Sequence, residues 1–173
     1  MIERATPVIL ATLALLLVPG MAGAQTTIVV DRIDILDYGL YTAAITGSVA
    51  SPGTASGTSH TVSDVQFYRR TDRVPASVGT SFGVKFVVVG RPSGEIVELR
   101  TVLKIPPPGV RNPKTGNVYR ETSITVQKVI GHDGSLTGYT LDEDWELVTG
   151  PWTLELWLGD RRMLSKTFTV YTP

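Results

Sequence analysis

The chain contains no cysteine among its 173 residues. This absence excludes disulfides, thiol chemistry and cysteine-ligated metal sites. An excess of either charge is also missing, because 16 Lys and Arg side chains balance 16 Asp and Glu side chains. A neutral chain has no electrostatic reason to bind nucleic acid or an anionic membrane surface. We therefore expect no nucleic-acid partner and a domain held together by packing and hydrogen bonds alone.

Long apolar runs are absent as well, except for one near the N-terminus. One arginine precedes the apolar run Val8–Val18, and Ala22-Gly23-Ala24 stands directly before Gln25. This layout is typical of a secretory signal peptide, and the run is shorter than the ~20 residues that span a bilayer. We expect a signal peptide over residues 1–24 and a single β-sandwich domain over residues 25–173. The mature protein is then extracytoplasmic, either periplasmic or secreted, with no stable membrane insertion after cleavage.

Sustained helical periodicity is missing from the rest of the chain, whereas alternation of apolar and polar residues recurs. Trp152, Leu154, Leu156 and Leu158 share one phase, which is typical of a half-buried strand. The pattern predicts an all-β fold, an antiparallel two-sheet immunoglobulin-like sandwich of about 7–8 strands. Further strands are predicted over residues 28–36, 40–49, 82–90, 95–105 and 124–129.

Proline and glycine mark the connections between these strands. Arg91-Pro92-Ser93-Gly94 predicts a tight turn that joins residues 82–90 and 95–105 as a hairpin, and His132-Asp133-Gly134-Ser135 predicts the next turn. Three stretches are predicted to be loops, the first mobile with nothing to bury and the last crossing between the sheets. They are Ser51–Ser63, Pro106–Gly116 and Thr140–Pro151.

The last predicted hairpin leaves one question open. Gly159-Asp160 suits a two-residue turn that pairs Leu156 with Met163 and Trp157 with Arg162. Continuing that register turns the apolar Phe168 and Val170 outward. A bulge near Lys166 or a longer loop is then needed, and the sequence does not decide between them.

Catalytic and metal-binding motifs are weak. Gly79-Thr80-Ser81-Phe82-Gly83 matches the nucleophile elbow of serine hydrolases, but that elbow needs a helix after it and a strand is predicted here. His60 and Asp64 need an ordered loop to hold a metal, and His132 lies in a turn. Asp142-Glu143-Asp144 lacks calcium-loop spacing and is expected to be a solvated acidic loop. We expect no enzymatic activity, no cofactor and no metal.

The three tryptophans differ in phase and in neighbours. Trp152 is in phase with leucines and is expected in the core, whereas Trp145 either plugs one end of the sandwich or protrudes. Trp157 is out of phase and faces outward, where it stacks on a sugar or anchors a partner, or is covered by a neighbouring strand or by Arg162. The tentative binding surface is therefore Trp157, Trp145 and Arg162, and the covered state of Trp157 is favoured.

Several separate segments share a pattern seen elsewhere. They are Asp37-Tyr38-Gly39-Leu40-Tyr41, Ser81-Phe82-Gly83-Val84, Asn112-Pro113-Lys114-Thr115-Gly116, Asp144-Trp145-Glu146-Leu147, Gly150–Leu156 and Phe168-Thr169-Val170. Together they resemble an uncharacterised bacterial family of exported immunoglobulin-like domains. The resemblance implies a β-sandwich and an exported bacterial protein. It implies no activity and no catalytic residue. The closing hairpin also resembles the last two strands of many bacterial immunoglobulin-like modules, which is a likeness of fold alone.

The function expected from these features is a non-enzymatic, exported module of the bacterial envelope. It serves protein interaction or structure, and its partner is another exported protein or an envelope component. The alternative is a carbohydrate- or cell-envelope-binding module that uses exposed aromatic side chains. A row of surface aromatics favours the alternative, whereas a flat apolar patch favours a protein partner.

Cleavage is predicted between Ala24 and Gln25, because small side chains stand at the two positions that the export peptidase reads. The intact mass of the protein purified from periplasm checks this directly. A purified product that still carries residues 1–24 contradicts the predicted export as a soluble protein.

Overall fold

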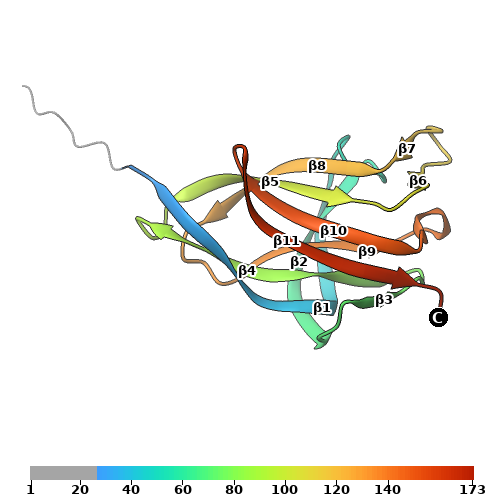
Figure 1. The fold of residues 1–173 in the computed structure, drawn as a ribbon, viewed down its shortest axis with the longest axis horizontal. Coiled ribbons are helices and arrows are strands. Elements are labelled where there is room, and N and C mark those ends of the chain that lie inside the picture. The colour runs from blue at the N-terminus through green and yellow to red at the C-terminus, as the bar shows by residue number, and fades with distance from the viewer. Residues whose placement is uncertain (1–26) are drawn as a thin grey trace, which may run out of the picture.

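The structure is a computed structural model that describes residues 27–173, so the predicted signal peptide and its cleavage site lie outside the described residues. Within this range the chain forms eleven strands and one short 3-10 helix (Figure 1). No helix in the same range is long and apolar enough to cross a membrane. The elements are β1 (Val29–Ala50), β2 (Thr58–Arg69), β3 (Arg73–Pro75), β4 (Thr80–Arg91), β5 (Ile96–Lys104), β6 (Val110–Arg111), β7 (Val118–Tyr119), β8 (Glu121–Val129), β9 (Ser135–Leu141), η1 (Asp144–Glu146), β10 (Gly150–Leu158) and β11 (Arg161–Tyr171).

Two sheets pack face to face and confirm the predicted sandwich. The first sheet has four strands in the order β2-β1-β4-β9, and the second has five in the order β3-β11-β10-β5-β8. Neighbouring strands in both sheets are antiparallel, except that the short β3 lies parallel to β11. Strands β6 and β7 form a separate small ribbon within the predicted Pro106–Gly116 loop region and just after it.

The predicted hairpin of residues 82–90 and 95–105 is wrong. Strand β4 pairs with β1 and β9, whereas β5 pairs with β10 and β8, so the turn after Arg91 carries the chain from the first sheet to the second. The turn at residues 131–134 carries it back, from β8 to β9, rather than closing a hairpin. A turn sequence shows that the chain reverses, but not which strands pair across the reversal. The predicted crossing after Thr140 is confirmed, since it joins β9 to β10 in the other sheet.

The two strands predicted near the start of the domain are one continuous strand, β1. It pairs with β4 as far as Tyr41 and with β2 from Leu40 onward. The expected long loop Ser51–Ser63 is also wrong, because β2 already begins at Thr58. The stretch buries something after all, since Ala55 is fully buried at the tip of the β1–β2 hairpin.

The C-terminal hairpin answers the question of register. Trp157 lies opposite Arg162 as predicted, but Leu156 lies opposite Leu164, which leaves Met163 as an extra residue. This bulge shifts the following residues by one, so Phe168 faces the core and is fully buried. The bulge is the correct alternative, at Met163 rather than near Lys166.

An aromatic cluster joins the inner faces of the two sheets. The ring of Phe82 in the first sheet lies 6.1 Å from Trp152 and 5.2 Å from Phe168 in the second, centroid to centroid. Trp152 is fully buried, as predicted, and its indole N–H donates to the carbonyl of Val148 at 2.8 Å. Edge-on aromatic pairs add to the burial energy, so this cluster helps to hold the two sheets together in a chain without disulfides.

Replacing Trp152 by alanine should lower the free energy of unfolding by about 3–5 kcal/mol, because a buried large aromatic leaves a cavity. The midpoint of urea unfolding measures the change. Tyr68→Ala is the control: that ring is 61 % exposed, and its loss should change stability by less than about 0.5 kcal/mol. Equal midpoints for the Trp152 variant and the parent contradict the packing described here.

Candidate functional site

The structure brings Trp157 and Arg162 together on the outer face of the second sheet, where charged groups cover the indole. The guanidinium carbons of Arg100 and Arg162 lie 5.1 and 6.0 Å from the centre of the Trp157 ring. The indole N–H donates to Glu155 at 2.9 Å. Trp157 is therefore half-buried, with its N–H bonded to Glu155 and its ring beside two arginines, which matches the covered state.

Glu155 organises this cluster. It is 2 % exposed although it lies on the outer face, and it accepts hydrogen bonds from Lys104 at 3.0 Å and from Arg162 at 3.2 Å. Burial opposes ionisation, but the bonds from Lys104, Trp157 and Arg162 outweigh it and hold the pKa of the carboxyl below its usual value. The carboxylate already has its partners, so the cluster stabilises the sheet and has little capacity left for a ligand.

Trp145 lies apart from this cluster, in helix η1 before the start of β10. Its side chain is partly buried and packs against the core, so it plugs the end of the sandwich rather than protruding. The structure therefore does not bring the three tentative surface residues together. Trp157 and Arg162 lie in one cluster with Glu155, and Trp145 packs against the core at the end of the sandwich.

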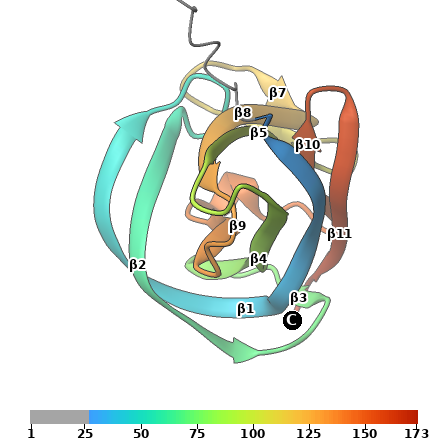
Figure 2. The ribbon, with the colours of Figure 1, turned by 90° about the vertical axis from the view of Figure 1, so that its left-hand side faces the viewer.

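A cavity with a volume of about 430 Å³ lies beside the free edges of β8 and β9. The β1–β2 hairpin curves around β9, and its tip reaches β8 (Figure 2). The tip is anchored to the turn between β6 and β7, where the side-chain amide of Asn112 donates to the carbonyl of Ala55 at 2.8 Å. The hairpin thus forms a roof, and the space beneath it continues past the edge of β9 into the gap between the sheets.

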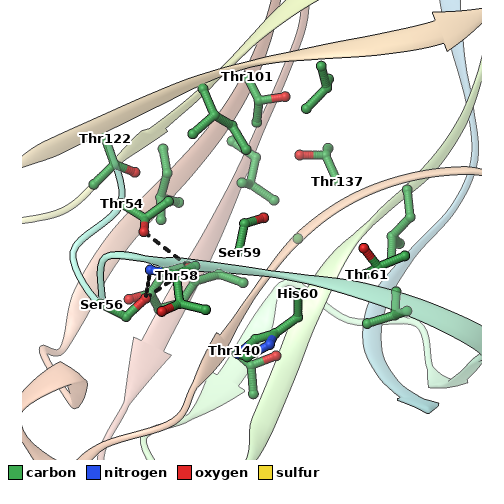
Figure 3. Close-up of a pocket in the computed structure, with 18 of the residues that line it drawn as sticks. Thr54, Ser56, Thr58, Ser59, His60, Thr61, Thr101, Thr122, Thr137 and Thr140 are labelled. Atoms are coloured by element: carbon green, nitrogen blue, oxygen red, sulfur yellow. Dashed lines mark hydrogen bonds between the residues drawn. The ribbon is translucent and has the colours of Figure 1, made fainter. Parts of the chain in front are cut away.

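Hydroxyl groups line both the roof and the walls of this cavity (Figure 3). Aliphatic side chains from β5, β8 and β10 lie between them, so the lining alternates between polar and apolar groups. The hydroxyl residues are Thr54, Ser56, Thr58, Ser59 and Thr61 in the hairpin, Thr101 and Thr122 in the second sheet, and Thr137 and Thr140 in β9.

Two of these threonines are deeply placed and lack partners. Thr122 and Thr137 are only 8 % and 7 % exposed, yet neither hydroxyl bonds to another residue in the range 27–173. Every side-chain nitrogen or oxygen that is closed off from solvent in that range has a partner, so these hydroxyls must open into the cavity. Tyr41 adds a phenol to the lining, and burial raises its pKa to about 12, so it remains protonated.

Charged groups stand in the cavity wall as well. Glu146 is 1 % exposed and accepts hydrogen bonds from the Tyr139 hydroxyl at 2.5 Å and from the backbone N–H of Asp142 at 2.7 Å. Burial raises the pKa of Glu146, and these hydrogen bonds offset part of the rise. Lys128 lines the same cavity from β8.

The histidine candidates are placed differently from the prediction. His60 lies in β2 rather than in a loop, and its acidic neighbour is Asp142, 3.9 Å away, instead of Asp64. Its other ring nitrogen is 2.7 Å from the Ser48 hydroxyl. His132 is exposed in the turn after β8. Among the described residues, no group of three or more metal-binding side chains comes together.

Ser81 has no surroundings typical of a nucleophile. It is the second residue of β4, and its hydroxyl lies 2.9 Å from that of Thr140 on the neighbouring strand. A strand follows it, as the sequence predicts, so the elbow that exposes a catalytic serine between a strand and a helix is not formed.

The cavity does not follow from the sequence, because the serine- and threonine-rich segment that forms its roof has the composition of a mobile loop. A signal was nevertheless present in the strand patterns. Thr101 stands in the inward phase of β5 between Leu99 and Leu103, and Lys128 continues the inward phase of Val126 in β8. Polar residues in an inward phase indicate either a buried hydrogen-bond network or a hollow.

Both a protein family and a solved structure are similar to this chain. The family described as "Domain of unknown function (DUF3859)" matches residues 29–170. The chain belongs to this family. An immunoglobulin-like protein from Pseudomonas aeruginosa (PA1606) has a similar structure, with a TM-score of 0.57 and 27 % sequence identity over 86 % of this chain and 100 % of that one. No curated protein matches the chain.

Membership of the DUF3859 family confirms the resemblance seen in the sequence. The immunoglobulin-like neighbour confirms the sandwich. The family's description assigns no activity, so membership carries no substrate and no site residue to this chain. The candidate site therefore depends on the geometry of the cavity.

Replacing Glu155 by glutamine should lower the free energy of unfolding at neutral pH by about 1.5–3 kcal/mol, the range for hydrogen bonds to charged groups. Folding lowers the pKa of this carboxyl from 4.5, so its contribution is complete above that pH and is lost as the pH falls through the lower, folded-state value. The free energy of unfolding is measured with urea at neutral pH and at ~pH 3. The difference in this free energy between parent and variant should be smaller in acid.

The matched control for this measurement is Glu98→Gln, on the exposed side of the same sheet. It should change stability by less than about 0.5 kcal/mol at both pH values. A gap for Glu155→Gln that stays constant or widens in acid contradicts the lowered pKa.

Proposed function

We propose that this DUF3859 domain is an exported, non-enzymatic binding domain of the bacterial envelope, and that its ligand enters the cavity beneath the β1–β2 hairpin. The ligand is another exported protein or an envelope component. The observation that carries the proposal is the pair of unpartnered hydroxyls on the deeply placed Thr122 and Thr137.

A core position normally carries an apolar side chain, because an unpaired polar group in the interior costs free energy. Here polar side chains occupy inward positions on three strands, and the space between them is open rather than filled. The cavity volume lies in the ~300–1,000 Å³ range of pockets that hold small ligands or parts of larger ones. Unused hydrogen-bonding capacity in a preformed pocket supports a binding role.

The positions of Ser48 and Ser81 support a binding role for the domain over an enzymatic one. The Ser48–His60–Asp142 arrangement resembles the order of groups in acyl-transfer enzymes. However, the Ser48 side chain is exposed and does not line the cavity, so a ligand held in the cavity does not meet the serine whose hydroxyl lies 2.7 Å from His60. Ser81 is bonded to Thr140 and has no histidine partner among the described residues.

A carbohydrate is the second candidate ligand, and the hydroxyl lining favours it, because hydroxyl groups both donate and accept hydrogen bonds. Carbohydrate binding through exposed aromatic side chains has less support. Trp157 is covered by two arginines, and Trp145 packs against the core.

Export is part of the proposal because residues 1–24 have the layout of a signal peptide. The family resemblance also implies exported bacterial proteins. Both arguments come from the sequence, and the mass of the periplasmic protein tests them independently of the cavity.

A photo-reactive amino acid placed at Ser59, in the cavity roof, should form an adduct with the ligand in living cells. The same amino acid at Thr167, exposed on the outer face of β11, serves as the control. We expect an adduct from position 59 alone, and its intact mass distinguishes a protein from a small carbohydrate. The additional change Ser48→Ala should leave the yield unaltered. No adduct, or equal adducts from both positions, contradicts binding in the cavity.

A further inference from the structure

Lys128 is an unusual residue for an inward-facing position. In β8 the inward phase runs through Thr122, Ile124 and Val126 and ends at Lys128, which lines the cavity. Its side chain is partly buried, and the ammonium lies 5.9 Å from the ring centre of the fully buried Phe86. A lysine directed toward the interior needs a compensating charge or contact with water.

No described residue supplies that charge. The ion pairs formed within residues 27–173 involve other side chains, and none reaches Lys128. Burial lowers the pKa of its ammonium, and no acidic neighbour opposes this effect. Glu155 shows the contrast, since that buried charge has both Lys104 and Arg162 within 3.2 Å.

The two carboxylates in the cavity wall do not serve as its counter-ions. Glu146 is occupied by the Tyr139 hydroxyl and by backbone N–H groups, and Asp142 faces His60. Both follow the C-terminal end of β9, whereas Lys128 precedes the turn that leads into its N-terminal end. The cavity therefore has a cationic end at the turn and an acidic end at the crossing to β10.

We propose that the cavity binds an organic carboxylate, with Lys128 as the counter-ion and the hydroxyl of Thr137 as a hydrogen-bond donor. This inference rests on the proposed function and adds the chemistry of the ligand. One lysine balances one negative charge, and no arginine lines the cavity among the described residues, so a monoanion fits better than a phosphate dianion. The carboxylate belongs to a sugar acid or to the C-terminus of a polypeptide.

The test uses nuclear magnetic resonance titration of the purified protein with two matched pairs of probes. The first pair is sodium glucuronate and glucose, and the second is N-acetyl-trialanine and N-acetyl-trialanine amide. In at least one pair, the carboxylate should bind about tenfold more tightly than its neutral counterpart, because it gains a charge-assisted hydrogen bond. The shifts should map to β8 and β9. The pair that shows the preference identifies the source of the carboxylate.

Variants assign the preference to one side chain. Lys128→Met keeps the length of the side chain and should abolish the preference for the carboxylate, whereas Lys128→Arg keeps the charge and should retain most of it. Lys85→Met is the control, since Lys85 is a partly buried strand lysine outside the cavity. A well-dispersed spectrum of each variant verifies its fold.

Three results overturn the inference. They are equal binding of the carboxylate and neutral probes, a preference that survives Lys128→Met, and no shift from any probe. If position 59 still forms its adduct in cells, the cavity remains a binding site and only its carboxylate chemistry is rejected. If the adduct is missing as well, the proposed function fails with the inference.

Discussion

The backbone pairing of β1 is the constraint on which the site depends. One strand of 22 residues is hydrogen-bonded to β4 through its first part and to β2 through its second. The change of partner occurs near Gly39, whose φ is +130°, and a side chain there would overlap the carbonyl of Arg69. Beyond this point β1 is free to leave the plane of the first sheet, and it bends around β9 (Figure 2). The roof of the cavity is a consequence of that bend.

A bent hairpin needs a second attachment, because two strands without further packing are barely stable in water. Here the attachment is made at the tip, where Ala55 is fully buried and accepts a hydrogen bond from Asn112. A side chain on Gly53 would overlap the carbonyl of Ser123 in β8, so the tip lies directly against the edge of the second sheet. The hairpin also covers part of the free edge of β8, which limits edge-to-edge association.

Local alternation was enough to predict most strands, the sandwich and the burial of Trp152, because each depends on the side-chain pattern of one segment. Strand partners were not predictable in the same way. Arg91–Glu95 has the composition of a hairpin turn, and whether it closes a hairpin depends on β9 and β1 already occupying both edges of β4. Of the tentative surface, the contact of Trp157 with Arg162 was predictable from register. The cavity was not, since a serine- and threonine-rich strand resembles a loop until its partner is known.

The contrast between Glu155 and the partly buried Lys128 shows how stability and binding differ. Glu155 lies on the outer face, yet Lys104 and Arg162 surround it and the folded chain supplies its whole hydrogen-bonding shell. Lys128 faces inward and receives no such shell from the described residues. A fold gains nothing from an interior ammonium that a methionine or leucine could replace with better packing. Its presence is explained if the missing partner comes from outside the chain, and the unpartnered hydroxyls of Thr122 and Thr137 in the same cavity point to the same source.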